Sequence, residues 1–170
     1  SLPTSEAQAE QFLGHGIRVL AVYTGESDAA GQYVQKACSG LIIGNEPGYA
    51  YPLGDASWPP GTVDDMVNVW GHVANVLVPR VHGAHFPLIG PGLWCQDAAA
   101  WARIAPYLPG LSAAAVHVYP APSGQSPAAV RTALARYRAV RPDLPLLATE
   151  WTARQPDVLA HYRAIKAHCD

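Results

Sequence analysis

The sequence predicts an α/β fold built around a parallel sheet, and two observations support this prediction. Short apolar runs rich in β-branched residues alternate along the chain with longer stretches of helical periodicity, which is the pattern of βαβ units. The apolar runs lack polar alternation, which is typical of strands buried on both faces. With 170 residues, no internal repeat and no long linker, we expect one domain over residues 1–170.

The first half of the chain is expected to form two helices and two strands. A helix is expected over 5–15, because Ser5 and Gln8 have the spacing of a capping box and a glycine, Gly14, ends the pattern. A strand over 17–23, a helix over 29–38 and a strand over 41–45 follow. The polar, Pro- and Gly-rich stretch 46–62 is long for a loop between a strand and a helix, which favours a binding role.

The second half continues the same alternation. Periodicity predicts a helix over 64–81, and Pro127 suits the first turn of another that runs to about 140. The remaining helices are expected over 98–108 and 156–168, and the strands over 86–90, 114–119 and 146–149. Right-handed crossovers close such strands into a (β/α)8 barrel or leave an open doubly wound sheet. In both folds, ligands bind beyond the carboxyl ends of the strands.

Charge and composition argue against several classes of function. A net charge of −2 gives no electrostatic attraction for nucleic acid or an anionic membrane, whereas a neutral carbohydrate polymer is a compatible partner. No run approaches the roughly 18 apolar residues of a membrane span, and the N-terminus has no basic region before an apolar stretch. The three cysteines and the pair His82 and His85 lack the spacing of a metal site, so we expect neither metal nor cofactor.

Two glutamates come directly after predicted strands. Glu46 follows the strand over 41–45, and Glu150 follows the strand over 146–149. In a parallel sheet both carboxyls then lie at the rim where ligands bind. Hydrolysis of a glycosidic bond uses such a pair, one carboxyl to protonate the leaving oxygen and one to attack or to activate water. The pair therefore predicts a glycoside-hydrolase active site.

Four strand-end motifs resemble those of the clan-A retaining glycoside hydrolases, which are (β/α)8 barrels. They follow the family's order: Gly44-Asn45-Glu46-Pro47, Gly90-Pro91, His117-Val118-Tyr119-Pro120 and Thr149-Glu150-Trp151. The Gly-Pro pair is similar to that of the xylosidase-like and heparanase-like branches. The resemblance covers nearly the whole chain, and it implies a carbohydrate substrate and a retaining double displacement.

The resemblance also implies a role for each matched residue. Glu46 would be the general acid/base and Glu150 the nucleophile, with their carboxyls about 5–5.5 Å apart. Asn45 would bind the 2-hydroxyl of the sugar, and Tyr119 would keep Glu150 ionised and correctly aimed. Three ring-bearing residues are assigned to the sugar site: His117, Trp151 and, from its place just after the Gly-Pro strand end, Trp94.

The chain supplies fewer strands than a complete barrel. A (β/α)8 barrel takes about 250 residues, and the five strands expected here match the family's strands three to seven. We therefore expect a partial or reduced barrel. It is either part of a larger protein or a naturally shortened barrel, or its open sheet edges are covered by neighbouring copies. A place outside the cell, or within a larger secreted or virion protein, is compatible with these possibilities.

Two other functions stay open at this point. A non-catalytic carbohydrate-binding or structural domain derived from such an enzyme would explain the missing strands, although both glutamates are present. A cell-wall-lysing domain would keep the same chemistry and change only the substrate.

Overall fold

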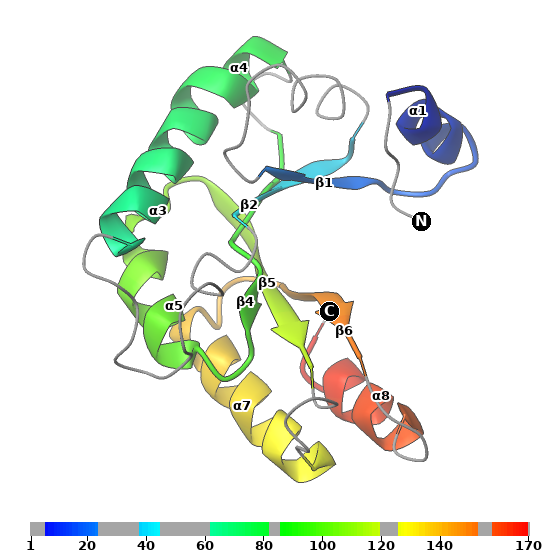
Figure 1. Cartoon of the computed structure of the whole chain (residues 1–170), viewed down its shortest axis with the longest axis vertical. Coiled ribbons are helices and arrows are strands. Elements are labelled where there is room, and N and C mark those ends of the chain that lie inside the picture. The colour runs from blue at the N-terminus through cyan, green and yellow to red at the C-terminus, as the bar shows by residue number, and fades with distance from the viewer. Residues whose placement is uncertain are drawn as a thin grey trace.

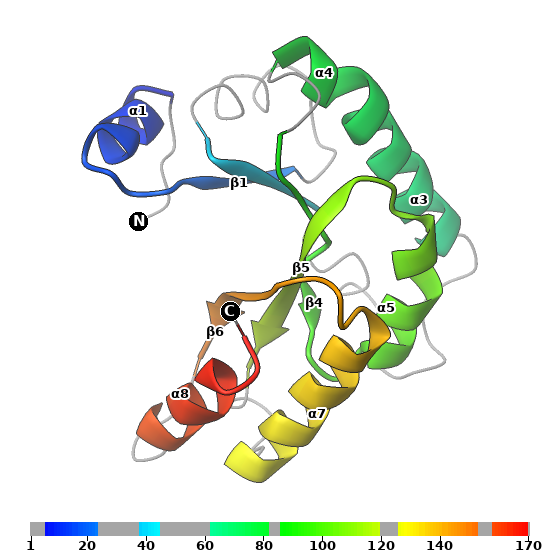
Figure 2. The same cartoon turned by 180° about the vertical axis from the view of Figure 1, so that it is seen from behind.

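A parallel sheet curled into about half a barrel forms the centre of the protein, with helices along its convex side (Figures 1 and 2). The computed structural model describes residues 6–23, 38–44, 62–81, 86–119, 126–152 and 158–169. The strands are β1 (Leu20–Tyr23), β2 (Gly40–Ile43), β3 (Leu88–Ile89), β4 (Leu93–Trp94), β5 (Leu111–Val118) and β6 (Leu146–Trp151). The helices are α1 (Glu6–Gly14), α3 (Thr62–His72), η1 (Val73–Leu77), α4 (Val78–Val81), α5 (Ala98–Ile104), η2 (Ala105–Tyr107), α7 (Pro127–Val140) and α8 (Val158–Lys166).

The described strands pair in parallel throughout. β2 lies between β1 and β3, and β5 pairs with β3, β4 and β6. β3 and β4 are two pieces of one strand position, because Leu88 pairs with Leu111 and Leu93 pairs with Val116 farther along β5. The six strand segments therefore occupy five positions. This arrangement confirms the predicted α/β fold, a parallel sheet of the partial TIM-barrel type.

Most helices form close to their predicted limits. α7 begins at Pro127, and the Ser126 hydroxyl caps it by accepting a hydrogen bond of 3.2 Å from the amide of Ala129. The helix expected over 64–81 is divided, because the π-helical turn η1 separates α3 from α4. The helix expected over 29–38 and the long loop after the second strand fall almost entirely outside the described residues.

The prediction missed β4, because a proline interrupts the third strand position. Pro91 has no amide hydrogen to give to a neighbouring strand, so the apolar pattern was expected to end there. Its two glycine neighbours continue the pairing instead. Gly90 donates a hydrogen bond of 2.8 Å to the carbonyl of Ala113, and Gly92 donates one of 3.1 Å to the carbonyl of Gly44. The segment between β3 and β4 is therefore tied to strands on both sides.

The two faces of the sheet carry different cores. On the outer face, side chains such as Leu41 and Val116 pack against the helices in one large buried cluster. On the inner face, Ile42 and Ala115 belong to a smaller cluster of four buried isoleucine and alanine side chains. Successive side chains of a strand point to opposite faces. The end of β5 therefore places His117 on the inner face.

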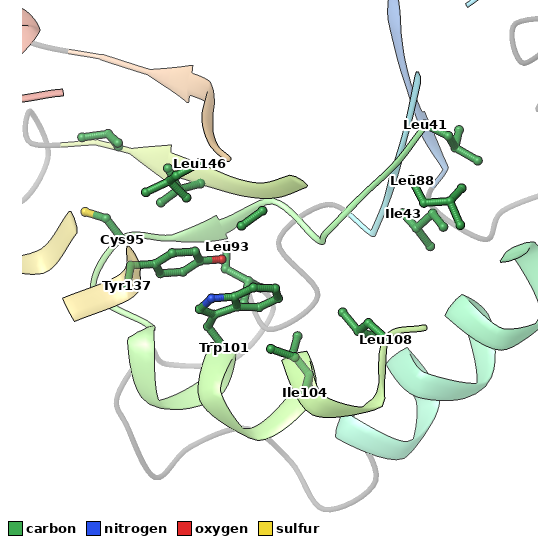
Figure 3. Close-up of a cluster of buried hydrophobic side chains, with 14 of the residues drawn as sticks. Leu41, Ile43, Leu88, Leu93, Cys95, Trp101, Ile104, Leu108, Tyr137 and Leu146 are labelled. Carbon is green, nitrogen blue, oxygen red and sulfur yellow. The ribbon is translucent and has the colours of Figure 1, made fainter. Parts of the chain in front are cut away.

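The centre of the outer core is a stack of two aromatic rings, seen in Figure 3 between the sheet and the helices. The rings of Trp101 in α5 and Tyr137 in α7 are 5.5 Å apart and nearly parallel, at 4°. Both side chains are almost completely buried. The Tyr137 hydroxyl donates a hydrogen bond of 2.9 Å to the carbonyl of Ala115 in β5. The stack therefore joins two helices to the strand that leads to His117.

Two of the three cysteines are buried in this core, and their thiols should be unreactive. Burial raises the pKa of the Cys38 thiol to about 11 and that of the Cys95 thiol to about 12. The thiolate is the form that reacts, so at pH 8 we expect iodoacetamide to leave both residues unmodified in the folded protein. Peptide mapping measures this, with urea-unfolded protein as the control that should react fully. Rapid alkylation of native Cys95 would contradict the packing described here.

The sheet ends at β1 on one side and at β6 on the other. Within the part of the chain that the structure describes, no strand pairs with the outer edge of either. Val22 in β1 is 41% exposed and Trp151 in β6 is 40% exposed, which is high for large apolar side chains. Covering of these edges by other parts of a larger protein or by neighbouring copies stays a prediction. None of the described helices combines the length and the apolar character needed to cross a membrane.

Candidate active site

An irregularity in the pairing of β5 with β6 brings Glu150 into line with His117. The pairing passes from Val116 and Ala148 directly to His117 and Glu150, so Thr149 is an extra residue in β6. A bulge of this kind re-aims the side chains that follow it. In an uninterrupted register His117 would face Thr149. With the extra residue, Glu150 shares the inner face with His117.

Two side chains from the end of β5 lie against the Glu150 carboxylate. The Tyr119 hydroxyl donates a hydrogen bond to Oε2, and Nε2 of His117 lies 3.7 Å from Oε1. The Tyr119 oxygen also lies 3.4 Å from Nδ1 of His117, so the three groups form a closed triangle. A phenol has one proton to donate, and here it goes to Glu150. The Tyr119 oxygen is therefore placed to accept from Nδ1 in the tautomer that carries a hydrogen there.

Glu150 and His117 differ sharply in exposure. The Glu150 side chain is 48% exposed, whereas that of His117 is 1% exposed. The backbone of His117 is also fixed, because its carbonyl accepts a hydrogen bond of 2.9 Å from the amide of Cys95. The carboxylate is thus accessible at the end of the sheet while the imidazole is fixed beside it. Such a rigid support for an accessible group is what an active site or a sugar-binding site requires.

Trp94 joins this group through Tyr119. Their ring centroids are 5.7 Å apart at an interplanar angle of 75°, an edge-to-face contact. Trp94 also pairs with His117 in the register of β4 and β5. The structure therefore brings four of the predicted site residues together at the carboxyl ends of neighbouring strands. We call Trp94, His117, Tyr119 and Glu150 the strand-end cluster.

Trp151 is placed apart from the strand-end cluster. It pairs with Val118, whose side chain belongs to the outer core. Its ring contacts that of Tyr162 in α8, with centroids 6.3 Å apart at 44°. The structure therefore does not bring Trp151 together with Trp94, and the sugar contact expected for Trp151 stays a prediction.

Asn45 and Glu46 lie outside the described residues, but the residue before them, Gly44, is described. Gly44 has a φ of 90°, a left-handed conformation in which any other side chain would be strained. Its carbonyl accepts the hydrogen bond from Gly92 noted above. The end of β2 is thus fastened to the segment that leads into β4. Gly44, the last described residue before Asn45, therefore lies beside the segment that leads to Trp94.

No role was predicted for Gly92 from the sequence, although it lies directly against the cluster. A Cβ at this position would lie 2.3 Å from Nε2 of His117. The two glycines flanking Pro91 were visible in the sequence, but only the pairing of β4 with β5 shows which ring faces the second of them. Among the described residues no group of three or more His, Cys, Asp or Glu could hold a metal ion. His82 and His85 lie outside the described residues.

Comparison with known proteins supports the fold at a coarse level. The sequence matches no protein-family model and no curated protein. The structure is similar to the crystal structure of a GH128 (subgroup VI) exo-β-1,3-glucanase from Aureobasidium namibiae, with a TM-score of 0.64 and 17% sequence identity. The similarity covers 91% of this chain and 60% of that chain, so this chain spans less than two thirds of its neighbour's length. The likeness shows a shared fold, and a glycoside-hydrolase function for this chain stays a prediction. The narrower assignment to the clan-A enzymes stays a prediction.

Proposed function

We propose that this chain is the catalytic part of a retaining glycoside hydrolase that acts on a β-linked glucan. The observation that carries the proposal is the Glu150 carboxylate: half-exposed, at the carboxyl end of a parallel strand, hydrogen-bonded by Tyr119 and flanked by His117. Parallel α/β sheets place their catalytic groups at this end. A surface glutamate without a role would not need a tyrosine donor and a buried imidazole to fix its direction.

The proposed reaction assigns one step to each carboxyl. Glu150 attacks the anomeric carbon while Glu46 gives its proton to the leaving glycosidic oxygen, and a glycosyl–enzyme ester forms. Glu46 then takes a proton from water, the water oxygen attacks the same carbon, and Glu150 leaves as a carboxylate. Asn45 binds the 2-hydroxyl of the sugar during both steps. The hydrogen bond from Tyr119 to Oε2 fixes the direction in which the carboxylate points.

The proposed substrate class comes from the structural neighbour and from the charge of the chain. That neighbour is an exo-β-1,3-glucanase, so a β-1,3-glucan is the first substrate to test. A neutral polymer also suits a chain whose net charge is −2. Trp94 adds an aromatic ring against Tyr119, the donor to the carboxylate, and a sugar ring can stack on such a surface.

A polysaccharide panel tests this proposal directly. The purified chain is incubated with β-1,3-glucan, other β-glucans, xylan and peptidoglycan, and new reducing ends are measured. We expect release from at least one β-glucan, with retention of anomeric configuration by NMR. Release from peptidoglycan alone would support the cell-wall-lysing alternative. Binding across the panel with no hydrolysis would overturn the enzyme assignment in favour of the carbohydrate-binding domain.

Replacing Tyr119 with phenylalanine should lower activity while the fold persists. The substitution keeps the edge-to-face contact with Trp94 and removes the hydrogen bond to Glu150. Loss of one donor that fixes a catalytic group should reduce kcat about 10- to 100-fold. Steady-state kinetics on the cleaved glucan measure the change. Tyr107→Phe is the matched control, because Tyr107 is 61% exposed and precedes β5 at the opposite end of that strand. Equal activity of the two variants would contradict the role of Tyr119.

A further inference from the structure

The strand-end cluster depends on a position that carries no side chain. Gly92 lies against the imidazole of His117: an added Cβ would be 2.3 Å from Nε2, 2.8 Å from Cε1 and 3.1 Å from Cδ2. Three atoms of one ring would thus lie closer to the Cβ than van der Waals contact allows. The ring edge concerned is the one whose Nε2 faces Glu150.

His117 has little freedom to move away from such a clash. Its side chain is 1% exposed, and its carbonyl accepts a hydrogen bond from the Cys95 amide. Its Nδ1 lies beside the Tyr119 hydroxyl. A ring displaced from Gly92 would change its distances to Glu150 and Tyr119. Because interiors are close-packed, the displacement would pass to these neighbours.

The requirement at Gly92 is one of space, not of backbone conformation. Among the described glycines, Gly16, Gly44 and Gly110 have positive φ, and Gly92 does not. The backbone at Gly92 would therefore accept alanine without strain, in contrast to Gly44. The hydrogen bond from the amide of residue 92 to the Gly44 carbonyl would also survive the substitution, since alanine keeps the amide hydrogen.

We propose that Gly92 is a positioning residue: it leaves the space into which the His117 ring fits, and through that ring it sets the direction of the Glu150 carboxylate. The proposal rests on the function proposed above only for its effect on catalysis. The placement of His117 by Gly92 is a structural statement that holds whatever the substrate is.

A double-mutant cycle tests the proposal, with Gly92→Ala, His117→Ala and the double variant compared. We expect Gly92→Ala to lower kcat about 100-fold, because a shift near 1 Å in a catalytic group has an effect of that size. We expect KM to change less, because the carboxylate acts in the chemical step. The double variant should match His117→Ala in kcat and in Tm, since removal of the ring removes the clash. If Gly92→Ala fails to fold, recovery of folding in the double variant carries the same information.

Gly71→Ala is the matched control, because a Cβ at this glycine in α3 meets nothing within 4 Å. It should leave kcat unchanged. A second measurement does not need activity: the imidazole resonances of His117, identified by their loss in His117→Ala, should shift in Gly92→Ala and stay in place in Gly71→Ala.

Two results would overturn the proposal. One is unchanged His117 resonances in Gly92→Ala. The other is a double variant whose kcat is lowered by the product of the two single-variant factors. If wild-type protein cleaves no glycan, the proposed function fails, while the His117 resonances and the recovery of Tm still decide the role of Gly92.

Discussion

Glu150→Gln should abolish hydrolysis of the glucan while the protein stays folded. The amide has the size of the carboxylate and can still accept the hydrogen bond from Tyr119, so the strand-end cluster should keep its shape. It cannot form the glycosyl–enzyme ester, and removal of a nucleophile typically lowers kcat by about 10⁴-fold or more. Release of reducing ends, followed over hours, measures the residual rate.

Glu10→Gln is the matched control for this substitution. Glu10 is an exposed glutamate on α1, and its replacement should leave the rate unchanged. Labelling by a 2-deoxy-2-fluoro glycoside with a good leaving group adds a second test, because this reagent traps the ester of a retaining enzyme. Mass spectrometry should find the label on Glu150. Full activity of Glu150→Gln, or a label on another residue, would refute the assignment of the nucleophile.

The parts of the fold that depend on one local pattern could be predicted from the sequence. The alternation of apolar runs with helical stretches predicted the five strand positions, and the fold confirms them. The motifs likewise placed Tyr119 and Glu150 at neighbouring strand ends, and the structure joins the two residues by a hydrogen bond. The separation of Glu46 from Glu150 stays a prediction, because Glu46 lies outside the described residues.

The arrangement around these residues could not be predicted, because it depends on pairing between distant segments. The position of Trp151 follows from strand alternation: once Glu150 faces inward, its neighbour faces outward. Which of the two faces inward depends on the bulge at Thr149, and no local sequence signal marks that bulge. β4 was hidden by Pro91, and with it the contact between Gly92 and His117.

The strand-end cluster rests on the outer core, through the stack of Trp101 on Tyr137. A Cβ at Gly90 would lie 3.3 Å from Cη2 of Trp101, so this ring packs directly beneath the segment that leads to Gly92. The Tyr137 hydroxyl donates a hydrogen bond to the carbonyl of Ala115, two residues before His117. The same two rings therefore support two of the three strands on which the cluster is built, β4 and β5.

Trp101→Ala should lower the free energy of unfolding by about 3 to 5 kcal/mol, as truncation of a buried tryptophan does in a core that cannot collapse around the cavity. Trp101 is 1% exposed and stacked on Tyr137, so the cavity would open between two helices and the sheet. Urea unfolding followed by circular dichroism measures the change. Tyr107→Ala removes an exposed aromatic ring and should change stability by about 0.5 kcal/mol or less.

Trp101→Phe separates the packing of the ring from its polar atom. Among the described residues, the buried Nε1 of Trp101 has no hydrogen-bond partner, and a buried donor without an acceptor is destabilising by about 1–3 kcal/mol. Phenylalanine removes that donor and keeps an aromatic ring for the stack. Trp101→Phe should therefore lower the free energy of unfolding by much less than Trp101→Ala does. An equal decrease in the free energy of unfolding for the two variants would mean that the volume lost with the indole, and not the unpaired donor, decides the stability at this position. A loss near zero for Trp101→Ala would mean that the stack does not support the strands beneath the cluster.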